Sequence, residues 1–174
     1  MLEGMLRRIR RLPFLWALRL ARLRTANEAP NRRPTEVEPG LFVGGIATRA
    51  RWVALRAAGV THVVTLLAET PPDPWLANAE AILWLPVVDR HPPSQAQLHA
   101  ACAFLDAARA RGGGVFIQCG LGMGRAPTVY LAWRARVARL DVATALSAVL
   151  QTRHIVHLTV SQREALERWV SDER

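Results

Sequence analysis

The chain has 174 residues, of which 51% are hydrophobic, so it is long enough for one domain with a sizeable core and a short extension. Its 23 basic residues are all arginine, a bias that we attribute to a GC-rich, bacterial coding sequence rather than to chemistry. The two cysteines, Cys102 and Cys119, cannot build a disulfide framework, which favours a reducing, cytoplasmic location.

The net charge of +9 is concentrated near the N-terminus. Residues 1–33 hold nine arginines and two acidic residues, which gives +7, and residues 34–174 hold fourteen arginines and twelve acidic residues, which gives +2. Because the basic character does not belong to the predicted folded body, we do not expect a nucleic-acid partner. The apolar runs of this tail are too short for a membrane span or a secretory signal.

Residues 1–24 mix apolar side chains with seven arginines, and Pro13 is a favourable first residue for a helix that runs to about Arg24. Two interpretations remain open. The helix lies on an anionic bilayer with Trp16 at the interface, as a peripheral contact at the inner membrane face, or the tail packs on its own domain or is disordered. Residues 27–39 contain three prolines and no periodicity, which indicates a linker. We therefore divide the chain into a tail and linker, 1–33, and a domain, 34–174.

The domain is predicted to alternate strands and helices. In chain order we expect a strand at 41–43, a helix at 48–58, a buried strand at 60–67, a loop at 71–74, a strand at 82–88, a helix at 95–111 and a strand at 115–118. Further helices are expected from Pro127, after Asp141, and after Thr159 or Ser161. This order predicts a single α/β domain with a central, mainly parallel sheet flanked by helices.

The most informative segment is Val-Phe-Ile-Gln-Cys-Gly-Leu-Gly-Met-Gly-Arg, at 115–125, which joins a buried strand to a helix start. Its alternating glycines allow the backbone to curl with its N–H groups inward, and such a nest at a helix N-terminus binds a phosphate dianion. Arg125 can hold two phosphate oxygens, and the same positive field favours the thiolate of Cys119, which is the nucleophilic form. The alternative is a buried structural cysteine in a plain turn, which does not require three glycines.

This loop resembles the Cys-x5-Arg signature of the protein tyrosine phosphatase superfamily, especially its dual-specificity branch, and the resemblance covers about residues 38–170. It implies a phosphocysteine mechanism at Cys119 without metal or cofactor. It also implies a phosphate-binding loop formed by Gly120, Leu121, Gly122, Met123, Gly124 and Arg125.

The run Leu-Pro-Val-Val-Asp-Arg-His-Pro-Pro-Ser resembles the general-acid loop of the same family, which implies that Asp89 protonates the leaving oxygen. A carboxyl group on a proline-flanked loop can swing over a bound phosphate. The alternatives are that Asp89 caps a turn or pairs with Arg90, and His91 is a weaker candidate acid.

Two positions depart from the family pattern. The family usually has histidine before the nucleophile, where it helps to hold the loop and to favour the thiolate, and this chain has Gln118. It usually has serine or threonine after the arginine, where the hydroxyl helps the thiolate to leave, and this chain has Ala126. The run Gly-Arg-Ala-Pro is also similar to the loop of plant glucan phosphatases, which work without that hydroxyl. Thr128 is a candidate substitute, with helix capping or packing as the alternative.

Other candidate residues give weaker evidence of a functional role. We expect His62 and Cys102 to be core or edge residues, and His154 and His157 lack the partners that a metal site needs.

The sequence therefore favours a phosphate monoester hydrolase. The alternatives are a pseudophosphatase that binds phosphorylated ligands, motivated by Gln118 and Ala126, and a rhodanese-like sulfurtransferase, which has no comparable acid loop. Expected substrates are a phosphorylated protein, a phospholipid or a small phosphate ester. Since the loop has no basic residue between Cys119 and Arg125, highly charged inositol polyphosphates are disfavoured.

Overall fold

A five-stranded sheet forms the centre of the protein. The computed structural model describes residues 33–173. The strands are β1 (Thr35–Glu38), β2 (Leu41–Gly44), β3 (Val60–Leu67), β4 (Ala81–Val87) and β5 (Gly114–Gln118), in the order β1-β2-β5-β3-β4. Among the strands of this described part, only β1 and β2 pair antiparallel; β2–β5, β5–β3 and β3–β4 are parallel. The predicted α/β domain with a mainly parallel sheet is confirmed.

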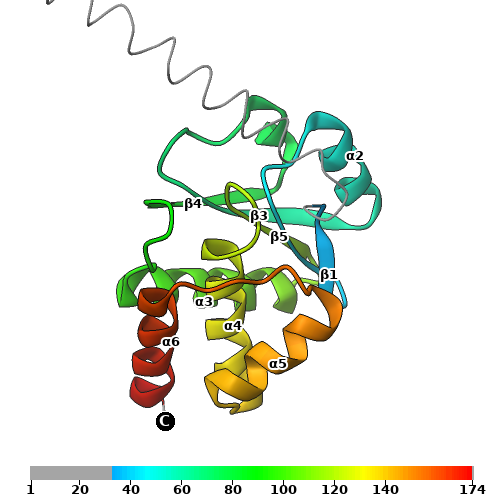
Figure 1. Ribbon diagram of the computed structural model, residues 1–174. Coiled ribbons are helices and arrows are strands. Elements are labelled where there is room, and N and C mark those ends of the chain that lie inside the picture. Colours follow the sequence, from blue (N-terminus) through cyan, green and yellow to red (C-terminus); the bar gives the residue numbers. More distant parts are fainter. Residues whose placement is uncertain (1–32, 174) are drawn as a thin grey trace, which may run out of the picture.

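Helices cover both faces of this sheet. They are α2 (Arg49–Ala57), the short 3₁₀ helix η2 (Pro74–Asn78), α3 (Gln95–Ala110), α4 (Arg125–Ala138), α5 (Val142–Thr152) and α6 (Val160–Asp172). Figure 1 shows α3 to α6 below the sheet and α2 above it. Among the described residues, no helix combines the length and the apolarity that crossing a bilayer requires.

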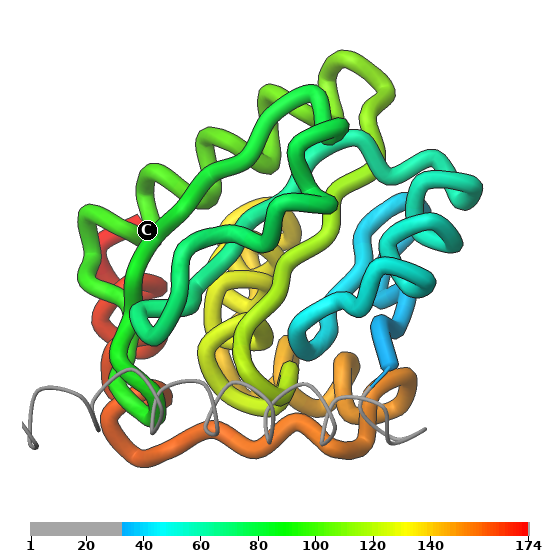
Figure 2. Tube along the Cα trace, turned by 90° about the horizontal axis from the view of Figure 1, so that it is seen from above, coloured from blue at the N-terminus to red at the C-terminus, as the bar shows by residue number. Residues whose placement is uncertain are grey.

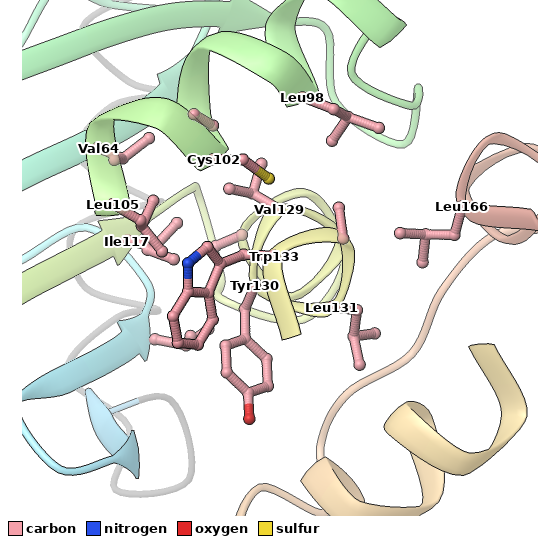
Figure 3. Packing of buried hydrophobic residues seen from close by; sticks show 14 of the residues in the cluster. Val64, Leu98, Cys102, Leu105, Ile117, Val129, Tyr130, Leu131, Trp133 and Leu166 are labelled. Atoms are coloured by element: carbon pink, nitrogen blue, oxygen red, sulfur yellow. The ribbon is translucent and has the colours of Figure 1, made fainter. Parts of the chain in front are cut away.

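Apolar patterning accounts for the two central strands. The strand β3 reads Val-Thr-His-Val-Val-Thr-Leu-Leu and all five residues of β5 are buried, as expected for strands covered on both faces. The main core lies between the sheet and α3, α4 and α6, where Leu105, Ile117 and Val129 pack together (Figure 3). A smaller core on the opposite face packs Trp52 and Leu76 against Phe116.

Three details differ from the sequence expectations. The strand β1 lies inside the predicted linker, because its edge position and flanking prolines leave no alternation of apolar and polar residues to recognise. Its Glu38 connects it to α4 through Tyr130 Oη (3.2 Å) and Arg134 Nε (3.1 Å). The helix η2 follows the predicted loop. The helix α4 begins at Arg125, two residues before the expected Pro127, which a proline in the first helical turn permits because that N–H needs no partner. The predicted helix from Pro13 lies outside the described residues.

The parallel strands end at a common edge. Gln118, the last residue of β5, pairs with Gly44 on β2 and with Thr65 on β3. The segment that follows β5 therefore lies outside the carboxyl ends of the central strands, which is the usual position of ligand sites in such sheets.

Candidate active site

The turn after β5 is built on a close approach between two backbones. Gly122 has a φ of +70°, which only glycine adopts without strain. A Cβ atom at this position would lie 2.3 Å from the carbonyl carbon of Gly44 and 2.6 Å from the nitrogen of Gly45. The loop after β5 can therefore approach the backbone of Gly44 and Gly45, at the end of β2, only because residue 122 has no side chain.

Cys119 lies at the floor of this turn and is only 3% exposed. Its backbone N–H donates to the carbonyl of Gly44 (3.3 Å), which ties the loop to the end of β2. Its Sγ accepts a hydrogen bond from the N–H of Gly122 (3.3 Å). An amide donor at this distance stabilises negative charge on the sulfur, and the N-terminus of α4 adds to the positive potential.

Arg125, the first residue of α4, is held from one side. Its Nη1 donates to both carboxylate oxygens of Glu69 (3.0 Å each) and to the carbonyls of Val87 (2.7 Å) and Leu66 (3.3 Å). Its Nη2 lies 3.0 Å from Oδ1 of Asp89, and its buried Nε has no partner among the described residues. The Nε–Nη2 edge, which is the edge that binds two oxygens of a phosphate, thus remains free of fixed backbone partners.

These groups share one hollow of about 280 Å³. The loop at 119–125 forms its floor, the segment around Asp89 forms one wall, and the start of α6 forms the other. Its lining residues are Asp89, Arg90, Cys119, Leu121, Met123, Gly124, Arg125, His157, Thr159 and Gln162. The Asp89 side chain is 56% exposed, so it reaches the hollow from the solvent side.

The two candidate support residues lie around the hollow and do not line it. Gln118 is buried, and its Oε1 accepts a hydrogen bond from the N–H of Ala47 (3.1 Å), which fixes the end of β5 to the segment after β2. Thr128 is buried as well, and its hydroxyl donates to the carbonyl of Gly124 (2.9 Å). Ala126 packs in the main core.

Arg153 is a second cation behind the loop that the sequence did not indicate. Its Nε donates to the carbonyl of Gly122 (3.0 Å), and its Nη1 donates to Thr35 Oγ1 (2.6 Å) and the carbonyl of Arg33 (2.8 Å). Burial lowers the pKa of Arg153 to about 10, and the charge of Cys119 acts in the opposite direction. The guanidinium therefore remains charged at neutral pH and adds positive potential behind the loop that carries Cys119.

The remaining candidates are distributed as follows. His62 is buried beside Phe104, His154 is exposed outside the hollow, and His157 lines the hollow. Cys102 is buried on α3. Among residues 33–173, no three histidine, cysteine or carboxylate side chains gather into a metal site.

Comparison with known proteins identifies the family. The family model of the Swiss Army Knife protein, DSP-PTPase phosphatase domain, matches residues 32–165. The dual specificity protein phosphatase 1B of Arabidopsis thaliana is 30% identical over 124 residues, which cover 69% of this chain and 71% of that protein. The human dual specificity protein phosphatase 1 is 29% identical, over 71% of this chain but only 33% of its own length.

Solved structures agree on the fold. The structure of human DUSP28 is 26% identical with a TM-score of 0.70, over 80% of this chain and 94% of that chain. The structure of PTPMT1 in complex with PI(5)P has a TM-score of 0.72 at 20% identity, over 81% of this chain and 96% of that chain, which shows a shared fold alone.

The fold and the loop define a cysteine-based phosphatase. The chain belongs to the dual-specificity branch of the protein tyrosine phosphatase superfamily. This membership favours the phosphatase over the sulfurtransferase alternative.

Proposed function

We propose that the chain hydrolyses phosphate monoesters in two steps through a phosphocysteine at Cys119. The observation that supports this most directly is the 3.0 Å contact between Arg125 Nη2 and Asp89 Oδ1 above Cys119. It brings a phosphate clamp and a carboxyl group to the same hollow as the nucleophile. Gly120, Leu121, Gly122, Met123 and Gly124 supply the surrounding loop.

In the first step the Cys119 thiolate attacks phosphorus, and the bond from phosphorus to the ester oxygen breaks. Asp89 gives its proton to the leaving oxygen. A bound phosphate takes the place of Asp89 on Nη2 of Arg125, which frees the carboxyl group to reach the leaving oxygen. Arg125 and the loop N–H groups stabilise the charge on the phosphoryl oxygens in the transition state.

In the second step water attacks the phosphocysteine. Asp89, now a carboxylate, accepts the proton of the water, the bond from sulfur to phosphorus breaks, and inorganic phosphate leaves. The departing Cys119 thiolate is stabilised by the N–H of Gly122 and the charge of Arg153. These groups supply part of what a hydroxyl at position 126 provides in relatives.

Hydrolysis of a fluorogenic aryl phosphate from about pH 5 to 8 tests the mechanism. We expect Cys119→Ser to lose all measurable turnover, and Asp89→Ala to lose about a hundredfold in kcat. Quenched-flow trapping of a phosphorylated Asp89→Ala enzyme would detect the phosphocysteine directly.

An inert wild type that still binds phosphate would favour the pseudophosphatase instead. In that case, Gln118→His and Ala126→Ser are the first variants expected to restore turnover.

We propose a phosphorylated protein or a phospholipid as the substrate class, with small phosphate esters as surrogates. The hollow supports this, since it is small, at about 280 Å³, and the Asp89 side chain on one wall is half exposed, which leaves room for a large group beyond the phosphate. PTPMT1, a structural neighbour, was solved with a phosphoinositide. We also propose a peripheral contact between residues 1–24 and an anionic membrane, which would bring the site to lipid headgroups or membrane-bound phosphoproteins.

A further inference from the structure

The loop that carries Asp89 has little packing of its own. In this acid loop, residues 88–93, the side chain of Val88 is 59% exposed. A hollow of about 360 Å³ lies beneath the loop, between it, the start of α3 and the middle of α6, where Ala165 and Arg168 line it. Arg90 has a φ of +67°, a left-handed conformation that costs a non-glycine residue about 1–2 kcal/mol. Since residues 88–91 are all exposed, burial does not hold this part of the loop in its strained form, and specific contacts must do so.

Two hydrogen bonds from the start of α6 provide such contacts. The hydroxyl of Thr159 donates to the carbonyl of Arg90 (3.1 Å), and Nε2 of Gln162 donates to the carbonyl of His91 (3.2 Å). Both carbonyls lie within two residues of Asp89. The tube in Figure 2 shows the segment that enters α6, in orange and red, passing beside the connection from β4 to α3, in green.

The same two side chains also cap α6. Thr159 Oγ1 accepts from the N–H of Gln162 (3.2 Å), and Gln162 Oε1 accepts from the N–H of Thr159 (3.0 Å). This capping box uses only the acceptor atoms of the pair. The donors, the hydroxyl proton and the amide NH₂, are left for the acid loop, so one pair of residues both starts a helix and holds the loop.

The helix α3 begins with the same chemistry at a different place. Ser94 and Gln97 form its capping box, and Nε2 of Gln97 donates to the carbonyl of Pro86 (3.1 Å), which belongs to β4. Because Pro86 lies in β4, the sheet already fixes the position of that carbonyl. The two glutamines therefore play the same capping role, but Gln162 donates to a carbonyl of the acid loop, whereas Gln97 donates to a carbonyl of β4.

We propose that Thr159 and Gln162 are positioning residues, which hold the acid loop so that Asp89 stays over Cys119 and Arg125. This rests on the proposed function, since it requires Asp89 to be the general acid. Substrates whose leaving oxygen most needs a proton depend most on the position of Asp89. Hydrolysis of such substrates should therefore be the property that these contacts control.

Gln162→Glu tests the proposal with little risk to folding. A carboxylate at this position still accepts from the N–H of Thr159 and completes the capping box, but it cannot donate to the carbonyl of His91. The readout is the ratio of kcat/KM for phenyl phosphate, a poor leaving group, to that for para-nitrophenyl phosphate, a good one. We expect this ratio to fall about tenfold, a part of the hundredfold or more that general acids contribute. Thr159→Ser, which keeps the hydroxyl, should retain the wild-type ratio.

Gln97→Glu is the matched control, and its ratio should equal that of the wild type. In an Asp89→Ala background, Gln162→Glu should cause no further fall. An unchanged ratio in Gln162→Glu, or an equal change in Gln97→Glu, overturns the positioning role alone. An inert wild type, or an Asp89→Ala enzyme as active as the wild type, overturns the proposed function and the positioning role together.

Discussion

Gly122 is the residue whose lack of a side chain matters most for the phosphate-binding loop. In Gly122→Ala the methyl group would meet the backbone of Gly44 and Gly45 in addition to straining a φ of +70°. The loop has to open, and a displacement of about 1 Å at a reacting group typically costs a hundredfold in rate. We therefore expect Gly122→Ala to lose about a hundredfold in kcat/KM on an aryl phosphate.

The variant Gly112→Ala separates the effect of backbone strain from the effect of a steric contact. Gly112 has a φ of +74°, but a Cβ there would meet nothing within 4 Å. This variant should lose about 1–2 kcal/mol of unfolding free energy in denaturant titration and keep full activity. Equal activity losses in both variants would show that the strain itself, and not the contact with Gly44, disturbs the site.

Sequence reasoning reached the residues of the short loop motif and, through the resemblance of the segment around it to a general-acid loop, Asp89, but it missed Glu69, Arg153 and Gln162. Cys119, Gly122 and Arg125 lie within seven positions, so their spacing carries the chemical signal. Glu69 and Gln162 come from distant segments, and only the fold brings Glu69 to Arg125 and Gln162 to the hollow. A single acidic residue after a strand, or a glutamine in a helical turn, has many roles, so neither could be assigned from the sequence.

At the scale of whole elements, the strongly periodic segments were predicted well. The residue ranges expected for β3, α3 and β5 agree with the structure to within about one residue, because burial on one or both faces fixes their patterns. The strand β1 was missed because its four residues gain their stability from β2 and α4. Such long-range contacts leave no periodic trace in the strand's own sequence.

The buried face of α3 predicts different reactivities for the two cysteines. Cys102 lies between Leu98 and Leu105 on the side that packs against α4 (Figure 3), and burial raises its pKa from 9.0 to about 12. At pH 8, iodoacetamide should therefore leave Cys102 unmodified in the native protein, whereas it should label Cys119, which lines the hollow, as read by peptide mass spectrometry. In denaturant both should react.

The sign of the linked pH effect follows from the same shift. Between about pH 9 and 12 the unfolded chain loses the Cys102 proton and the folded chain keeps it. This thiol thus lowers the unfolding free energy as the pH rises through that window, and has no such effect below it. Native labelling of Cys102 at pH 8 would contradict the packing of α3 described above.

At the scale of the whole molecule, the sheet class followed from the order of the elements, whereas the strand order did not. Nothing in the sequence of β5 states that it lies between β2 and β3. That central position is nevertheless what sets the loop against the glycine pair after β2. The location of the site thus depends on topology, and its chemistry depends on the local motif.

The uneven charge of the chain predicts a salt-sensitive membrane contact. We expect the full chain to sediment with vesicles of phosphatidylcholine and phosphatidylglycerol at low salt, and a chain lacking residues 1–24 to remain in the supernatant. Binding should weaken as salt screens the seven arginines of that segment. Neutral phosphatidylcholine vesicles provide the control, and equal binding of both chains would contradict the role of the tail.

Arg153 connects that experiment to the active site. Its guanidinium group donates hydrogen bonds to the carbonyl of Arg33, at the start of the domain, and to the carbonyl of Gly122, in the loop after β5. The start of the described domain and the loop after β5 are therefore linked through one side chain, although 89 positions separate Arg33 from Gly122 in the sequence. A truncation that ends before Arg33 keeps these hydrogen bonds. A truncation that extends beyond Thr35 removes both Arg33 and Thr35, so Arg153 loses the partners that hold it against the carbonyl of Gly122.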